Sequence, residues 1–222
     1  MKRAVVLLSG GLDSATCLYW AKAKGYRIDA LGVDYGQRHA KELKAARTLA
    51  RKAGARFTAL RVKLPWLNIS SLVDSGKRLP NVSLSKIGAG SIPSTYVPGR
   101  NTMFVSFGIS LADAVGAESI IVGANALDYS GYPDCRPDFY EAFARVAKLG
   151  TRRGVSGKRL RIDAPLLGKD KAGIVRLAGR LGVPLRHTWS CYQGGGRPCG
   201  RCDSCKLRRK GFAEAGVKDP AL

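Results

Sequence analysis

A loop near the start of the chain carries the residue types that hold a phosphate group. Residues 9–14 read Ser-Gly-Gly-Leu-Asp-Ser, between an apolar run at 4–8 and a helical pattern that ends at Gly25. The apolar run predicts a buried strand. Adjacent glycines permit a sharp turn close to a ligand, and the amides at a helix N-terminus favour an anion. We therefore expect an anion-binding turn, with hydroxyl donors from Ser9 and Ser14 and a helix cap from Asp13.

Two other groups of side chains suit phosphate charge. Arg100 and Asn101 stand just before an apolar stretch at 102–115, and this position suits an anion clamp at a helix N-terminus. The apolar stretch is hydrophobic almost all round and predicts a buried helix. Lys171 falls in the first turn of a helix that ends near residue 181, where a cation gains nothing from the helix dipole. A phosphate partner explains that lysine. The alternatives are a capped turn without a ligand at 9–14, an N-cap Asn101 beside a solvated Arg100, and a solvated Lys171.

Four cysteines lie close together near the end of the chain: Cys191, Cys199, Cys202 and Cys205. The last three repeat an x₂ spacing, and a glycine-rich loop allows the first to return to them. Four thiolates match tetrahedral zinc in a closed, structural site, and an iron–sulfur cluster accepts the same ligands. The two remaining cysteines, Cys17 and Cys135, are expected to be a core residue and an unreactive residue of a loop, respectively.

The elements that must position these groups alternate along the chain. Strands are expected at 4–8, 27–33, 57–62, 119–124 and 160–164, and helices at 15–24, 40–53, 102–115, 139–149, 171–181 and 206–215. This order predicts an α/β fold, an open parallel five-stranded sheet with helices on both faces. The long segment 64–100 breaks the periodicity and indicates a functional lid.

The ends of two predicted strands add polar and aromatic groups at one edge of the sheet. Tyr35 follows the second strand, where it would contact adenine or ribose. The loop after the fourth strand contains Asp128, Tyr132 and Asp134, which would frame a planar heterocycle.

The composition limits the class of protein. The chain has 222 residues and 45% hydrophobic residues, enough for one domain with a sizeable core. Its apolar runs are too short to span a membrane, and Met1-Lys2-Arg3 leads directly into a strand without a signal peptide. A cytoplasmic location is therefore expected. The net charge of +22 allows a polyanion partner such as RNA, but the basic residues are spread along the chain, which favours a general composition effect.

Several motifs in order resemble the 7-cyano-7-deazaguanine synthase family of the ATP-pyrophosphatase (PP-loop) superfamily. They are the loop at 9–14, Asp-Tyr-Gly-Gln-Arg-His at 34–39, Val-Pro-Gly-Arg-Asn at 97–101, Ser-Gly-Tyr-Pro-Asp-Cys-Arg at 130–136, Lys171, and Ser-Cys-Tyr at 190–192 with the cysteine cluster. The resemblance covers essentially the whole chain.

The resemblance implies an ATP-dependent ligase of queuosine precursor biosynthesis. Such an enzyme converts 7-carboxy-7-deazaguanine and ammonia into 7-cyano-7-deazaguanine through an adenylated carboxylate and an amide. The implied fold is like that of the adenine nucleotide alpha hydrolases. The implied organisation is a catalytic domain at 1–186, with the lid at 64–100, and a zinc-binding element at 187–222. The resemblance also implies a homodimer, and bound ATP, Mg²⁺ and structural Zn²⁺.

The same resemblance gives roles to individual residues. The catalytic residues are expected to be Asp13, Ser14, Arg100 and Lys171. The nucleotide is expected to bind Leu8, Ser9, Gly10, Gly11, Leu12, Asp13, Ser14, Ala15, Thr16, Cys17, Leu18, Asp34 and Tyr35. The deazaguanine is expected to bind Arg100, Asn101, Asp128, Tyr132, Asp134 and Arg136. The metal ligands are Cys191, Cys199, Cys202 and Cys205.

Two other functions remain open at this point. A tRNA-modifying enzyme of the same superfamily, of the thiolase or lysidine synthetase type, would explain the high positive charge. A zinc-containing nucleic-acid-binding module with a vestigial nucleotide fold is a different class, but the intact loop at 9–14 argues against it. Nucleic acid is therefore not the expected partner.

Overall fold

The computed structural model describes residues 1–38, 41–87, 92–125 and 132–221. In these ranges five parallel strands form one sheet in the order β3-β2-β1-β4-β5. The strands are β1 (Arg3–Leu7), β2 (Arg27–Asp34), β3 (Arg56–Arg61), β4 (Ser119–Ile121) and β5 (Arg161–Asp163). The predicted parallel five-stranded sheet is thus confirmed. Strands β2 and β3 are added on one side of β1, and β4 and β5 on the other. Ligand crevices form at such a switch point in open α/β folds.

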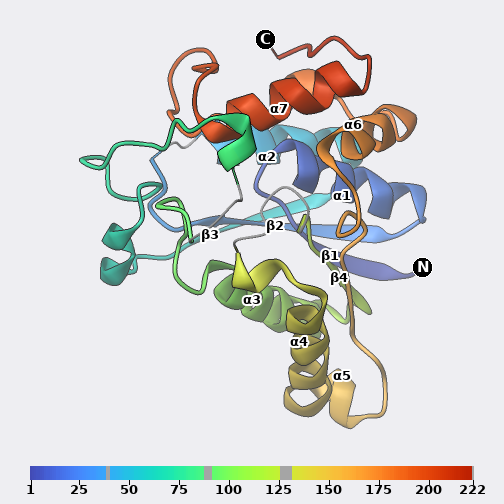
Figure 1. The fold of residues 1–222 in the computed structure, drawn as a ribbon. Coiled ribbons are helices and arrows are strands. Elements are labelled where there is room, and N and C mark those ends of the chain that lie inside the picture. Colours follow the sequence, from blue (N-terminus) through green and yellow to red (C-terminus); the bar gives the residue numbers. More distant parts are fainter. Residues whose placement is uncertain (39–40, 88–91, 126–131, 222) are drawn as a thin grey trace.

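Helices cover both faces of the sheet, as Figure 1 shows. They are α1 (Leu12–Ala23), α2 (Lys41–Ala53), α3 (Arg100–Val115), α4 (Pro137–Gly150), α5 (Arg152–Val155), α6 (Lys171–Arg180) and α7 (Asp203–Glu214). Buried side chains of α1, α2, α6 and α7 form one hydrophobic core, and those of α3 and α4 form a second. Neighbouring residues of β1 serve opposite cores, because Val5 belongs to the second and Val6 to the first.

The start and the burial of α3 differ from the prediction. The helix begins at Arg100 and is preceded by Gly99 in a left-handed conformation, with φ of 61°. Arg100 and Asn101 are therefore the first two residues of α3 and not residues that precede it. The helix is also not buried all round, because Thr102, Ser106, Ser110 and Ala114 are exposed at intervals of four residues. This small and polar stripe was hidden by the high overall hydrophobicity of the segment.

The described parts of the segment 64–100 pack on the main body. Leu67, Leu72 and Val97 are buried in the second core. Val82 accepts a hydrogen bond from Lys206 of α7 through its carbonyl oxygen, at 2.6 Å. The segment therefore crosses from the second core to the C-terminal helix, where Figure 1 shows it beside α7.

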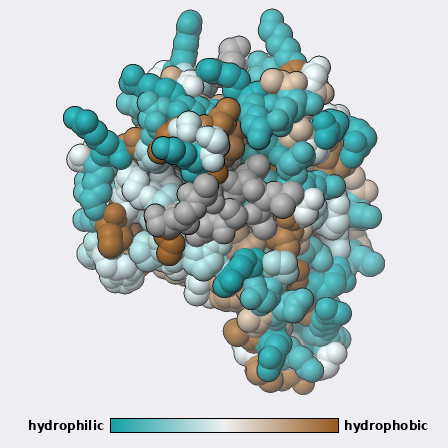
Figure 2. Space-filling view, viewed as in Figure 1, coloured by the Kyte–Doolittle hydropathy of each residue, from teal (hydrophilic) through white to brown (hydrophobic). Residues whose placement is uncertain are grey.

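Most of the face in Figure 2 is hydrophilic. Hydrophobic atoms gather at the tip formed by α4 and α5 in that view. Val146, Leu149 and Val155 are more than half exposed there, Leu149 by 75%. Among the described residues, no helix combines the length and apolarity that a membrane crossing requires.

Candidate active site

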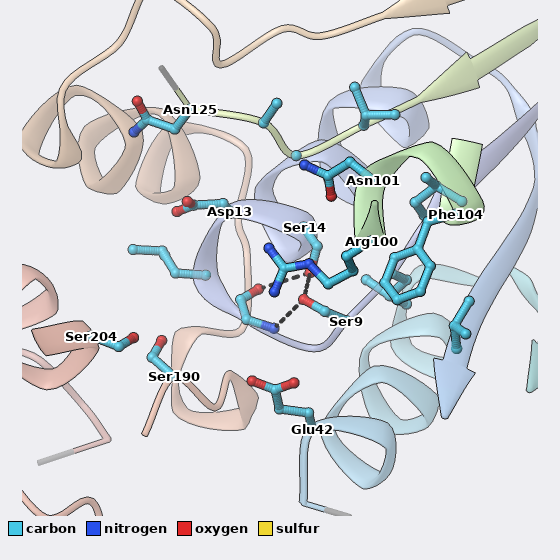
Figure 3. A pocket seen from close by; sticks show the side chains of 18 of the residues that line it. Ser9, Asp13, Ser14, Glu42, Arg100, Asn101, Phe104, Asn125, Ser190 and Ser204 are labelled. Atoms are coloured by element: carbon cyan, nitrogen blue, oxygen red, sulfur yellow. Dashed lines mark hydrogen bonds between the residues drawn. The ribbon is translucent and has the colours of Figure 1, made fainter. Parts of the chain in front are cut away.

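A cavity of about 280 Å³ opens where the carboxyl ends of β1 and β4 meet. Its walls come from the loop after β1, the first turns of α2, α3 and α6, the segment after β4, and the C-terminal region. Figure 3 shows side chains from the loop after β1, α2, α3, the segment after β4 and the C-terminal region around one hollow. Of the predicted site residues, those that line it are Leu8, Ser9, Gly11, Leu12, Asp13, Ser14, Tyr35, Arg100, Asn101, Tyr132 and Lys171.

The loop after β1 is held open by its own hydroxyl groups. Ser14 Oγ lies 3.0 Å from Ser9 Oγ, accepts from the Gly10 amide at 3.2 Å, and donates to the Gly11 carbonyl. Gly10 has a φ of 93°, in the left-handed region that favours glycine. A Cβ there would lie 2.2 Å from the Glu42 carbonyl oxygen. The loop thus needs glycine both for its turn and for the close approach of α2.

Lys171 forms an ion pair with Asp13 across the cavity floor. Its Nζ lies 3.0 and 2.9 Å from the two carboxylate oxygens. The side chains are 11% and 22% exposed, respectively. The prediction that Asp13 caps α1 is wrong, because Gly11 is the N-cap residue and the carboxylate turns to Lys171. The pair places a cation and an anion beside the amides of the loop.

Arg100 brings a permanent positive charge into the cavity. Figure 3 shows its guanidinium reaching from α3 towards the loop that carries Ser9 and Ser14. Burial alone would lower the pKa of Arg100, but the neighbouring Tyr35, Tyr132 and Asp134 outweigh it and raise that pKa. Burial raises the pKa of both tyrosines, which stay neutral. The guanidinium therefore remains charged and faces an anion-binding loop.

Asp134 organises the side of the cavity near α3. Its carboxylate accepts from the Asn101 backbone amide at 3.2 Å, and its carbonyl accepts from the Asn101 side chain at 3.1 Å. Asp134 itself does not line the cavity, and neither does Arg136, which is exposed and donates to the Pro133 carbonyl. Asp128 lies outside the described residues.

The other residues that were predicted to bind the nucleotide do not line the cavity. Ala15, Thr16, Cys17 and Leu18 are buried within α1, and Cys17 belongs to the core as predicted. Asp34 accepts from Arg61 at 3.2 Å and does not line the cavity. Cys135 does line it, but burial and then Asp134 raise the pKa of its thiol to about 11, which keeps the thiol unreactive.

Glu42 lines the cavity and was missed by the sequence analysis. It lies in the first turn of α2, and Figure 3 shows its carboxylate pointing into the hollow on the side of Ser9. Burial raises the pKa of Glu42 to about 7, against an opposing effect of Arg100. Its only sequence signal was an acidic residue at a helix start, which is common on protein surfaces.

The C-terminal region supplies another wall that the sequence did not reveal. The Trp189 amide donates to the Gly10 carbonyl at 2.9 Å and so fastens this region to the loop. Ser190, Tyr192, Ser204 and Arg208 line the cavity from this side. Arg208 forms a buried pair with Asp219, at 2.6 and 2.9 Å, and donates to Ser190 at 3.2 Å. The wall is therefore anchored to α7.

The four predicted cysteine ligands come together beside this wall. Their sulfur atoms all lie within 4.8 Å of one another. Tetrahedral zinc with bonds of about 2.3 Å needs sulfurs about 3.8 Å apart, and the Sγ atoms of Cys199 and Cys205 are separated by 4.0 Å. Amides of Gln193 and Cys199 point at the Cys191 sulfur, at 3.4 and 3.3 Å. Donation from Cys202 and Cys205 lowers the pKa of Cys191. The cluster fits a closed four-thiolate metal site.

Comparison with known proteins gives the family context of this cavity. The model of the family "Queuosine biosynthesis protein QueC" matches residues 3–216. A 7-cyano-7-deazaguanine synthase from Anaeromyxobacter dehalogenans is 57% identical over 221 residues, which cover 99% of this chain and 94% of the relative. Another from Nostoc punctiforme is 49% identical and covered over 99% of both chains.

Two solved structures share the fold at low identity. NMN synthetase from Francisella tularensis superposes with a TM-score of 0.53 at 16% identity, over 98% of this chain and 78% of that one. A 4-thiouridine synthetase, solved with RNA and bound ATP, gives a TM-score of 0.52 at 21% identity, over 97% and 50%. These likenesses confirm the expected α/β fold class.

Proposed function

The chain belongs to the family of queuosine biosynthesis protein QueC, and we propose that its cavity uses ATP and ammonia to convert 7-carboxy-7-deazaguanine into 7-cyano-7-deazaguanine. The observation that carries the proposal is the family match from residue 3 to 216, whose relatives bear the name of this synthase. The cavity adds an anion-binding loop between a paired lysine and a charged arginine.

The reaction requires two activations of one carbon atom. A carboxylate is a poor electrophile, so its oxygen first attacks the α-phosphorus of ATP, and pyrophosphate leaves. Ammonia then displaces AMP to give the amide. The amide oxygen attacks the α-phosphorus of a second ATP, and a second pyrophosphate leaves. Loss of AMP and of the two N–H protons then leaves the nitrile. A protein assists such steps mainly by holding reactants in place and stabilising phosphate charge.

The residues of the cavity suit these tasks. Leu8 to Ser14 would hold the phosphates through amides and hydroxyls, with Tyr35 beside the nucleotide. Lys171 and Arg100 would stabilise the charge that develops on phosphate. Asn101 and Tyr132 would contact the deazaguanine. Asp134 would act through the Asn101 amide, to which it is bonded.

Two metals belong to the proposal. Mg²⁺ would accompany ATP and neutralise its phosphates. Zn²⁺ would bind Cys191, Cys199, Cys202 and Cys205 and stabilise the C-terminal wall, since a closed thiolate shell is structural. We further propose that residues 1–186 form the catalytic domain and 187–222 the metal-binding element, that the segment 64–100 is a lid, and that the enzyme is a cytoplasmic homodimer.

The decisive assay mixes purified protein with ATP, Mg²⁺, ammonium and 7-carboxy-7-deazaguanine and identifies products by mass spectrometry. We expect the nitrile, with two AMP released for each molecule formed. Asp13→Ala serves as the inactive control, because it leaves Lys171 without its carboxylate partner in the cavity. Absence of nitrile and amide with a folded, ATP-binding protein would refute the proposal.

A second candidate, a tRNA-modifying enzyme, is favoured by one observation, the net charge of +22. Binding of tRNA that depends on phosphate contacts weakens steeply with salt. Tight tRNA binding at physiological salt, together with ATP turnover that requires tRNA, would favour this candidate over the synthase.

A further inference from the structure

The carboxylate of Glu42 lines the cavity, and none of the steps proposed above uses it. The described cavity lining contains one other carboxylate, Asp13, whose two oxygens both bind Lys171. Among the described residues, by contrast, the carboxylate of Glu42 takes part in no hydrogen bond or ion pair. Glu42 is partly buried, so water can reach its carboxylate in the open cavity. A ligand that displaces this water must supply N–H or O–H donors in its place.

The backbone fixes where this carboxylate stands. The first turn of α2 packs directly on the phosphate loop, since the Glu42 carbonyl oxygen lies where a Cβ of Gly10 would be. Two turns further on, Leu49 and Ala50 anchor the helix in the core. The backbone of Glu42 is therefore fixed beside the phosphate loop, and its side chain extends into the cavity from there.

The neighbouring charges limit what Glu42 can bind. A second anion, such as a phosphate oxygen, would repel the carboxylate. Arg100 is close enough to affect Glu42 electrostatically but makes no hydrogen bond with it among the described contacts. A small cation with several N–H donors would satisfy the carboxylate, and the attraction between the two opposes the repulsion from Arg100. The aromatic groups that suit a flat ring are Phe104 of α3 and Tyr132, which lies near Arg100 at the start of α3.

We propose that the Glu42 carboxylate binds the ammonium ion and aims its nitrogen at the acyl carbon of the adenylate. This inference rests on the proposed function. Ammonium loses one proton to water, its nitrogen forms the C–N bond, and the C–O bond to the phosphate breaks. AMP leaves with the electron pair, and the nitrogen loses a second proton to water. The products are the amide, AMP and two protons.

The test uses Glu42→Gln in the full-length, metal-loaded enzyme. Exchange of labelled pyrophosphate into ATP in the presence of 7-carboxy-7-deazaguanine reports adenylation without any nitrogen nucleophile. Steady-state amide and nitrile formation over a range of ammonium concentrations reports the later step. Glu141→Gln, an exposed change of the same kind on α4, is the matched control.

We expect the variant to keep pyrophosphate exchange within about twofold while its KM for ammonium rises by roughly 10-fold or more, the loss typical of one charge-assisted hydrogen bond. Hydroxylamine, which is uncharged at neutral pH, also captures acyl adenylates. Because it needs no carboxylate to neutralise it, the variant should lose much less activity with hydroxylamine than with ammonium. A merely structural defect would reduce both alike.

Three results would overturn the proposal. The first is an unchanged KM for ammonium. The second is an equal loss with the two nucleophiles. The third is a higher KM for 7-carboxy-7-deazaguanine at constant KM for ammonium, which would place the carboxylate on the N–H edge of the heterocycle. If the unmodified enzyme shows neither exchange nor nitrile, the proposed function fails instead, independently of Glu42.

Discussion

The side chain of Lys171 lies against Gly211, so closely that a Cβ atom at Gly211 would be 2.3 Å from Cγ of Lys171. Lys171 begins α6 and Gly211 lies within α7, so one helix shapes the position of a cavity residue on the other. The lysine can reach Asp13 because this turn of α7 has no side chain. A glycine on α7 thereby helps to position the positive charge of Lys171 in the cavity.

Gly211→Ala should lower both activity and stability, because a Cβ there would also lie 2.8 Å from Cβ and 3.1 Å from the backbone carbonyl carbon of Lys171. The added methyl group must push Lys171 away from Asp13, so we expect at least a tenfold loss of kcat, since misplacement of a charged group by about 1 Å has effects of that order or larger. Gly179→Ala is the control, because that position in α6 has open space around it. The control should gain up to about 1 kcal/mol in stability and keep full activity. Equal activity of the two variants would contradict this role of Gly211.

Cys202→Ser should remove the bound metal and destabilise the fold, because metal binding is coupled to folding. Metal analysis and thermal unfolding measure the two effects, and Cys135→Ser, outside the cluster, should keep its metal. Activity should fall as well, since the amide of Trp189 joins the metal-binding region to Gly10. A Cys202→Ser protein with full metal content and unchanged Tm would rule out the four-thiolate site.

The stability of the protein should depend on pH through Glu42. The pKa of this residue rises from its ordinary value of 4.5 to about 7 on folding, chiefly through burial. The folded state therefore holds the proton more tightly, and stability is lost as pH rises from about 4.5 to 7. Glu42→Gln removes this loss. Urea unfolding should show the variant more stable than the unmodified protein by about 1–3 kcal/mol at pH 8 and by little at pH 4.5. A constant difference between the two proteins would contradict the shift.

Gly10→Ala should be far more damaging than Gly36→Ala. Both glycines have positive φ, 93° and 85°, so each substitution costs about 1–2 kcal/mol in backbone strain. Only Gly10 also meets backbone atoms, the Glu42 carbonyl at 2.2 Å and the Ala46 amide at 2.7 Å. Denaturant unfolding of both variants isolates the second effect. Similar stabilities would show that α2 does not rest on the loop.

The features that could be predicted from the sequence are those that depend on residues close to one another in the chain. The loop at 9–14 and the cysteine spacing are local patterns, and the structure places the four sulfurs of that spacing together. Asp13 shows the limit of such reasoning. Its position beside a helix start suggested a cap, but its partner Lys171 is 158 residues away.

The missed residues depend on packing between distant elements. Glu42 becomes part of the cavity only because α2 rests on Gly10. Ser190 and Ser204 become part of it only because the C-terminal region folds back on the loop. Neither contact leaves a periodic pattern in the sequence. The exposed stripe of α3 was missed for a related reason, since small residues such as Ser106 and Ala114 hardly lower the hydrophobicity of a segment.

The link between Trp189 and Gly10 also has a meaning for synthesis on the ribosome. The loop after β1 leaves the exit tunnel early, whereas the wall formed by Ser190, Ser204 and Arg208 emerges only after the whole sheet has been made. All five strands are thus made before the residues that form this wall of the cavity. The cavity is in this way complete only after translation has passed the last cysteine.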